Sequence, residues 1–257
     1  MKKLLCFCCG LLVATVGVRA TVLFSDTFTY PNGNLVGQGP GPWAQTGTSS
    51  TTPIQVNAGV AVMGSIGGQD ANSWIPFYTL VDGSSIYFGA DLNVSTAAVA
   101  GDYFMHWAPS SSSTAFMSRL EIRSTAGGFN VGLINSSSGT LTWGADVFSF
   151  GAHRVVVSYD SITGTLNDTG NVWVDGTHEI IDNPWGAATN PEPTALGAIN
   201  LRQGGATTSP GLTVDNLNVA TSFAEVATFT AVVPEPTSLS LLGGFGLLAL
   251  LISRRRR

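Results

Sequence analysis

Cysteine is missing from this chain of 257 residues after Cys9, and lysine is missing after Lys3. Without cysteine, the remainder can form no disulfide, no thiolate metal site and no thiol nucleophile. It must therefore fold around a hydrophobic core, for which roughly 200 residues are ample. The 3.6-residue apolar period of amphipathic helices is also missing between residues 21 and 231, which argues against a helical domain.

Positive charge is scarce as well. Seven of the eleven basic residues lie at the two ends of the chain, and only Arg119, Arg123, Arg154 and Arg202 lie between Thr21 and Pro236. These four stand against sixteen acidic residues, which gives that part a net charge of −12. Such a surface cannot neutralise phosphates, so nucleic acid is excluded as a partner. Its polarity comes mainly from Ser, Thr, Asn and Gly, as is typical of exported β-proteins.

The N-terminus has the layout of a secretory signal peptide. A basic start, Met1–Lys3, is followed by an apolar stretch, Leu4–Val18, and by small residues that predict cleavage after Ala20. Residues 1–20 are therefore predicted to be removed, and all three cysteines are removed with them.

The C-terminus predicts a membrane span. Residues 237–253 carry no charge, and 17 residues of helix reach about 25 Å, the short limit for a bilayer. Arg254, Arg255, Arg256 and Arg257 follow, and a cationic flank stays on the cytoplasmic side. The rest of the chain is then expected outside the membrane. An ordinary C-terminal membrane anchor remains an alternative interpretation.

Pro234, Glu235 and Pro236, followed by the apolar helix and the arginine cluster, resemble the PEP-CTERM sorting signal of exopolysaccharide-producing bacteria. The resemblance implies recognition by an exosortase, a membrane transpeptidase that removes the tail. It covers residues 233–257 and concerns address, not activity. A second copy of the tripeptide, Pro191–Pro193, is followed by no apolar span and serves as an internal control.

The body reads as an all-β domain over residues 21–221, followed by a linker over 222–232. Apolar residues alternate with polar ones, most clearly around Ile86–Val94, which is the period of half-buried strands. Turn signals such as Asp175-Gly176 separate the runs. Further strands are expected at Val22–Phe28, Ile54–Met63, Tyr103–Trp107, Phe116–Arg123, Phe129–Leu133, Val155–Tyr159, Val172–Val174, Leu196–Arg202 and Leu212–Val219. The pattern predicts an antiparallel sandwich or barrel in one domain.

Four segments resemble strands of concanavalin A-like and laminin-G-like domains: Phe24–Gly33, Gly151–Asp160, Gly170–Gly176 and Leu212–Val219. The chain departs from that pattern at Ala152, where those families carry Trp. The resemblance implies a two-sheet jelly roll whose concave face often binds sugars.

Tryptophans in loops are the candidate sugar contacts, since an aromatic face matches the CH-rich face of a sugar ring. Trp43 and Trp185 lie in Pro/Gly-rich segments and are the better candidates for exposed platforms, and Trp173 is a third candidate; core packing is the commoner role of a tryptophan and the alternative for each. The resemblance also raises a calcium site at Asp82, Asp175 or Asp215, although Asp-Gly turns need no metal. No other cofactor is expected.

Catalytic patterns are weak. The nearest match to the paired carboxylates of jelly-roll glycosidases is Glu179–Asp182, whose spacing places the two acids on opposite faces of a strand. Glu121 lies between Arg119 and Arg123 and reads as a solvated charge cluster. His106, His153 and His178 show no metal-ligand spacing, and His153 suits a structural hydrogen bond.

These patterns predict a non-catalytic, carbohydrate-associated protein. It is expected as an inner-membrane-anchored precursor that is then delivered to the cell surface or extracellular matrix, with exosortase and exopolysaccharide or another glycan as partners. Two alternatives stay open: a divergent jelly-roll glycoside hydrolase and a purely structural surface protein.

Overall fold

The computed structural model describes residues 21–39, 41–46, 52–68, 70–110, 115–186, 191–205 and 208–228. The predicted signal peptide and the sorting tail at 233–257 lie outside these residues. Within them, no helix is both long and apolar enough to cross a bilayer.

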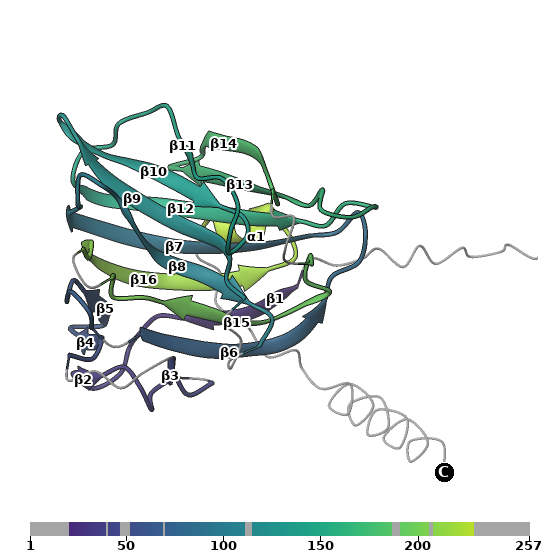
Figure 1. Ribbon diagram of the computed structural model, residues 1–257. Coiled ribbons are helices and arrows are strands. Elements are labelled where there is room, and N and C mark those ends of the chain that lie inside the picture. Colours follow the sequence, from purple (N-terminus) through teal and green to yellow (C-terminus); the bar gives the residue numbers. More distant parts are fainter. Residues whose placement is uncertain are drawn as a thin grey trace, which may run out of the picture.

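The described strands form two antiparallel sheets that pack face to face (Figure 1). A nine-stranded sheet has the order β14 (Thr177–Pro184), β13 (Thr169–Val174), β12 (Gly151–Asp160), β7 (Ser85–Thr96), β16 (Gly211–Ala220), β5 (Val60–Met63), β4 (Gln55–Asn57) and β2 (Gly33–Asn34), with β1 (Val22–Asp26) also paired to β16. A seven-stranded sheet has the order β11 (Thr142–Trp143), β10 (Gly128–Ile134), β9 (Met117–Thr125), β8 (Asp102–Ala108), β15 (Ala195–Leu201), β6 (Asp70–Thr79) and β3 (Ala44–Thr46). The predicted all-β jelly-roll sandwich is confirmed.

The core lies between the sheets, where alternation along each strand places the apolar side chains. On β7, Ile86, Phe88 and Leu92 are buried, and Phe88 meets Trp107 of the other sheet edge-to-face at 5.1 Å between ring centroids. The predicted Asp175-Gly176 turn joins β13 to β14, and both residues have the positive φ of a type I′ hairpin.

Some strands were predicted incorrectly or not at all. The segment Ile54–Met63 is a hairpin of β4 and β5 that turns at Ala58-Gly59, where φ is positive. The long strand β6 was missed because its inward positions include Ala71 and Ser73, which give little apolar contrast. The strands β2, β3, β11 and β14 were also not predicted.

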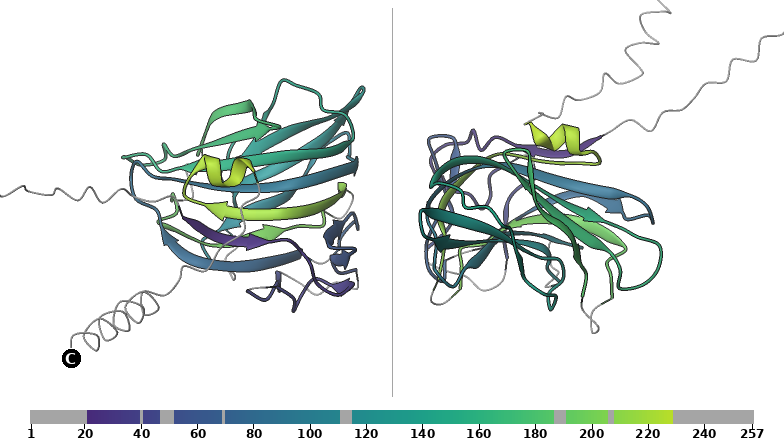
Figure 2. Two further views of the ribbon diagram at one scale, coloured as in Figure 1. Left: turned by 180° about the vertical axis from the view of Figure 1, so that it is seen from behind. Right: turned by 90° about the horizontal axis from the view of Figure 1, so that it is seen from above.

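The start of the predicted linker is instead part of the folded body. Residues Phe223–Ala227 form a short helix, α1, that lies on the outer face of the nine-stranded sheet (Figure 2). Val226 is fully buried and packs with Val156 and Ala220. Gly89 makes this contact possible, because a side chain there would overlap the carbonyl oxygen of Val226. The linker prediction of 222–232 is therefore wrong at its N-terminal end.

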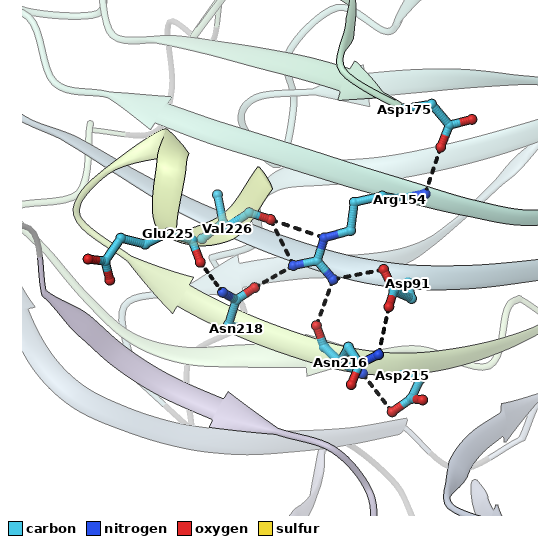
Figure 3. Close-up of polar contacts among 8 residues, drawn as sticks. All are labelled: Asp91, Arg154, Asp175, Asp215, Asn216, Asn218, Glu225 and Val226. Atoms are coloured by element: carbon cyan, nitrogen blue, oxygen red, sulfur yellow. Dashed lines mark hydrogen bonds and ion pairs between the residues drawn. The ribbon is translucent and has the colours of Figure 1, made fainter. Parts of the chain in front are cut away.

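The guanidinium of Arg154 fixes α1 to the sheet (Figure 3). Its Nε and Nη2 donate to the Val226 carbonyl at 3.0 and 2.7 Å, and Nη1 donates to the Asn216 carbonyl at 2.8 Å. The side chains of Asp91 and Asn218 accept further hydrogen bonds, at 3.0 and 2.6 Å. We call this group the Arg154 junction. Five hydrogen bonds from one side chain connect α1, β7, β12 and β16.

Candidate functional site

The outer face of the seven-stranded sheet carries three of the four arginines in the described part of the chain. On β9, Leu120 and Ile122 point into the core, so Arg119, Glu121 and Arg123 point to the opposite face. Neighbouring strands add further side chains to this surface. We call it the polar face and define it by Tyr103, Arg119, Glu121, Arg123, Trp143 and Arg202.

Strand register aligns part of the polar face into a row. Tyr103 on β8 is opposite Glu121 on β9, which is opposite Gly132 on β10, which is opposite Trp143 on β11. Gly132 leaves room for the indole ring, since a Cβ there would lie 2.7 Å from Cε3 of Trp143. Gly101 makes room in the same way for the far edge of that ring. Two glycines thus allow Trp143 to lie close to the sheet.

Each of these two aromatic rings lies beneath a guanidinium group. The Cζ of Arg202 lies 3.9 Å from the ring centroid of Tyr103, and the Cζ of Arg119 lies 5.1 Å from it. The Cζ of Arg123 lies 4.3 Å from the ring centroid of Trp143. These distances are within the range of cation–π interactions. The interactions position three guanidinium groups on one face of the sheet.

The three arginines differ in how many of their N–H groups are hydrogen-bonded within the protein. Arg202 pairs with Asp102 at 2.7 Å and donates to the Tyr103 carbonyl at 3.0 Å. The Nη2 of Arg119 donates to two backbone carbonyls at 3.2 and 3.1 Å. Arg123 makes one long bond, from Nε to Asn130 at 3.3 Å. Among the described residues, no acceptor takes a hydrogen bond from its two Nη atoms, so Arg123 is the most available donor.

Burial controls the ionisation of this face. It raises the pKa of Glu121, and Arg119 and Arg202 only partly oppose the effect. Burial also raises the pKa of Tyr103. The nearby His106 is fully buried, and its pKa is lowered to about 3, so the imidazole is neutral at physiological pH. The expected solvated cluster around Glu121 is wrong, because only 7% of this residue is exposed.

Trp43 and Trp185 are both buried, so the exposed-platform hypothesis is wrong for them and the core-packing alternative is confirmed. Trp43 is 1% exposed, and its indole Nε1 donates to the buried Asp26 at 2.7 Å. Trp185 is 3% exposed and meets Tyr159 edge-to-face at 6.1 Å. Trp43 offers no face to a ligand, and Trp185 contributes only to the wall of an apolar cavity. Both segments are rich in Gly and Pro, but their two indole rings belong to the buried core cluster.

Trp173 lies on the opposite side of the molecule from the polar face. It is half-buried, stacks on His178 at 4.4 Å and meets Phe223 of α1 at 4.9 Å. Protein side chains therefore already cover this ring. The three predicted tryptophans do not come together into one site.

The remaining sequence candidates have structural partners. Glu179 accepts a hydrogen bond from the Asp146 backbone, and its electrostatic neighbours do not include Glu121. Asp182 lies at an irregular point of β14 with a φ of 48°. His153 bonds to Asp175 at 2.7 Å and to the Ser149 carbonyl at 2.8 Å, which confirms its structural hydrogen bond.

Calcium finds no cluster in the described part of the chain, where no three His, Asp or Glu residues are arranged to hold a metal. Asp175 accepts from the Arg154 backbone and Asp215 from the Asn216 backbone. Asp82 lines a separate cavity of about 510 Å³ at one end of the sandwich. The three acids therefore do not combine into one site.

An apolar cavity of about 530 Å³ lies at the same end, lined by Phe77, Phe116, Trp185 and the internal Pro191-Glu192-Pro193 segment. Glu192 accepts a hydrogen bond from the Asp168 backbone at 2.7 Å, so this copy of the tripeptide is built into the folded body. The cavity offers few polar groups, whereas sugars need many hydrogen-bond partners. The polar face is the better candidate for carbohydrate.

The sequence contained part of this site. Arg119, Glu121 and Arg123 were placed on one face of a strand, and the scarcity of arginine was evident. Tyr103, Trp143 and Arg202 were missed as partners because they come from three other segments. Only the register of β8, β9, β10 and β11, with β15 beside β8, brings them together.

No family model matches this chain, and no curated protein matches it. Solved structures do. An alginate lyase, Aly36B, as a double mutant in complex with alginate tetrasaccharide, matches with a TM-score of 0.50 at 12% identity, covering 78% of this chain and 96% of that one. The CBM2 module of the evolved Dit of Lactobacillus casei BL23 phage J-1 matches with a TM-score of 0.50 at 10% identity, covering 78% and 95%. At these identities the likeness establishes a shared jelly-roll sandwich fold.

Proposed function

We propose that this chain is an exported surface or matrix protein that binds carbohydrate through its polar face. One observation carries the proposal: the register of four strands brings cationic, carboxylic and aromatic side chains together on one outer sheet face. Hydrogen-bonding groups beside aromatic rings are what sugar recognition requires. The jelly-roll neighbours include a protein solved with a bound alginate oligosaccharide, which is compatible with this use of the fold.

A binding role fits the polar face better than glycoside hydrolysis. Hydrolysis needs two carboxyl groups about 5 to 10 Å apart on either side of the scissile bond. Glu121 has Asp102 as its electrostatic carboxylate neighbour, but Asp102 already accepts from Arg202, Gly205 and Thr208. The face therefore offers one unengaged carboxyl group and no evident partner for it.

Retention of the full chain, in mild detergent, on immobilised polysaccharides tests the proposal. We expect Trp143→Ala to weaken retention about tenfold, because the indole ring supports Arg123 and contributes contact area. Ile181→Ala, which removes a 66% exposed apolar side chain from β14, is expected to change nothing. Binding to no polysaccharide would reject the proposal. Release of reducing sugar that is lost in Glu121→Gln or Glu179→Gln would instead favour the hydrolase.

We also propose that the tail directs sorting by an exosortase. Support comes from the order of Pro234-Glu235-Pro236, apolar segment and arginines. The internal Pro191-Glu192-Pro193 differs, since it lines two cavities of the body and Glu192 is hydrogen-bonded there. The precursor would be held in the inner membrane until the tail is removed.

Alanine replacement of each tripeptide in turn gives a matched test. In a host with an exosortase, we expect replacement of residues 234–236 to leave the uncut precursor in the membrane fraction. Replacement of residues 191–193 should leave processing unchanged, provided that the protein still folds. Equal processing of all three proteins on an immunoblot would rule out the sorting proposal.

A further inference from the structure

We propose that the polar face takes a polyanionic glycan, whose sugars carry carboxylate or sulfate groups. This inference rests on the proposed function and specifies the class of glycan. It begins with the distribution of charge: three of the four arginines between Thr21 and Pro236 lie on this face. The fourth, Arg154, is used to hold α1 on the opposite sheet.

The acidic residues Asp102 and Glu121 lie near the polar face, but a ligand has little access to their carboxyl groups. Asp102 is 10% exposed in its side chain, and its oxygens are occupied by Arg202, Gly205 and Thr208. Only 7% of Glu121 is exposed, so its carboxyl group is largely out of reach of a ligand. A polyanion would therefore meet the guanidinium groups before it meets the carboxyl groups of Asp102 or Glu121.

The position of the guanidinium groups argues against a neutral sugar. A neutral sugar gains most from stacking its CH-rich face on an exposed aromatic ring. On this surface Arg202 lies over Tyr103 at 3.9 Å and Arg123 lies over Trp143 at 4.3 Å. The groups that lie over both rings, and that a ligand would contact there, are therefore guanidinium N–H donors. N–H donors bind the oxygen atoms of a carboxylate or sulfate better than they bind the CH-rich face of a neutral sugar.

Unused donors point the same way. The two Nη atoms of Arg123 have no acceptor among the described residues. A guanidinium fork fits the two oxygens of a carboxylate or sulfate in a bidentate pair. Because Trp143 limits the rotation of Arg123, less conformational entropy is lost when the pair forms.

The negative charge on the rest of the surface favours binding of a polyanion at the polar face over binding elsewhere. The part between Thr21 and Pro236 has a net charge of −12, so other surfaces repel a polyanion while the arginine cluster attracts it. The attraction acts between partly exposed charges, so it must weaken as salt rises.

The test uses the full chain in mild detergent over sensors coated with alginate, dextran sulfate or neutral dextran, at 50 and 500 mM salt. We expect binding to at least one of the two polyanions, at least tenfold weaker at the higher salt, and no binding to dextran. Binding to alginate alone would identify carboxylate groups, and binding to dextran sulfate alone would identify sulfate groups. Both results support the inference.

Arg123→Gln is expected to weaken polyanion binding about tenfold, and Arg123→Lys, which keeps the charge but loses the fork, about threefold. Asn93→Asp is the matched control, because it makes the same change of net charge on the outer face of β7, where Asn93 is exposed. Equal losses in Arg123→Gln and Asn93→Asp would overturn the assignment to the polar face. Binding of wild type to dextran but to neither polyanion would overturn the inference and leave the proposed function standing. Binding to none of these would overturn the inference, and the wider panel then decides the proposed function.

Discussion

Replacement of Arg154 by methionine is expected to lower the free energy of unfolding by about 3 kcal/mol. Removing one partner of a buried ion pair typically costs about 3–5 kcal/mol, and we take the lower end because 43% of the Asp91 side chain is exposed. Methionine keeps much of the side-chain volume but leaves the Val226 and Asn216 carbonyls without their guanidinium donor. Urea unfolding followed by tryptophan fluorescence measures the change.

The same substitution should loosen α1 before the sandwich unfolds. Arg154 is the side chain that donates to the Val226 carbonyl, and Asn218 donates to the Glu225 carbonyl (Figure 3). We expect limited proteolysis to cut Arg154→Met near residues 223–228 much faster than wild type. Arg154→Lys retains the charge and is expected to lose about half as much stability. Wild-type stability and protection in Arg154→Met would show that the junction does not hold the helix.

Replacement of Trp43 by alanine is expected to cost about 4 kcal/mol. The indole ring is 1% exposed, stacks on Phe28 at 5.9 Å and meets Phe24 edge-to-face at 6.4 Å, and large-to-small changes of Trp in a core cost about 3–5 kcal/mol. The change also removes the indole donor from Asp26, whose burial already raises its pKa. Because whole domains are stable by only about 5–15 kcal/mol, this loss removes a large fraction of the stability, and thermal unfolding followed by circular dichroism should show a lower midpoint than wild type.

Trp43→Phe separates the two contributions. Phenylalanine retains most of the ring packing, while Asp26 keeps the donors from Tyr30 at 2.6 Å and from the Phe28 backbone at 2.7 Å. We expect a loss of about 1–2 kcal/mol, the cost of one unmade hydrogen bond to a buried carboxyl group. Trp143→Phe on the polar face should lower the free energy of unfolding by less than Trp43→Phe does. If Trp43→Ala weakened glycan binding without loss of stability, the original sugar-contact hypothesis for this residue would return.

The segment that follows β16 illustrates what alternation alone could not locate. Residues 222–228 lack a strand period, and five residues of helix are too few to show a helical one. Their position is decided by contacts with distant residues: Gly89 gives the space, Val156 gives the apolar surface and Arg154 gives the hydrogen bonds. Gly89 lies on β7, and Arg154 and Val156 lie on β12, so both strands are far from α1 in the sequence.

The exposed-platform hypothesis for Trp43 and Trp185 fails for a related reason. Trp43 and Trp185 follow turn-forming residues, and composition makes such segments look like surface loops. Loop composition does not say which way a loop folds. Asp26 accepts the indole N–H of Trp43, and Tyr159 packs against Trp185, so both rings close the core instead of facing solvent.

The sequence alone determined the fold class and the charge of this protein. Period-two alternation depends only on neighbours along the chain, and it identified the strands with the strongest apolar contrast, such as β7 and β12. The tertiary structure alone decided the candidate site, because residues as far apart as Tyr103, Trp143 and Arg202 meet only through strand register. Register is set by the packing of both sheets together, a property that no single segment contains.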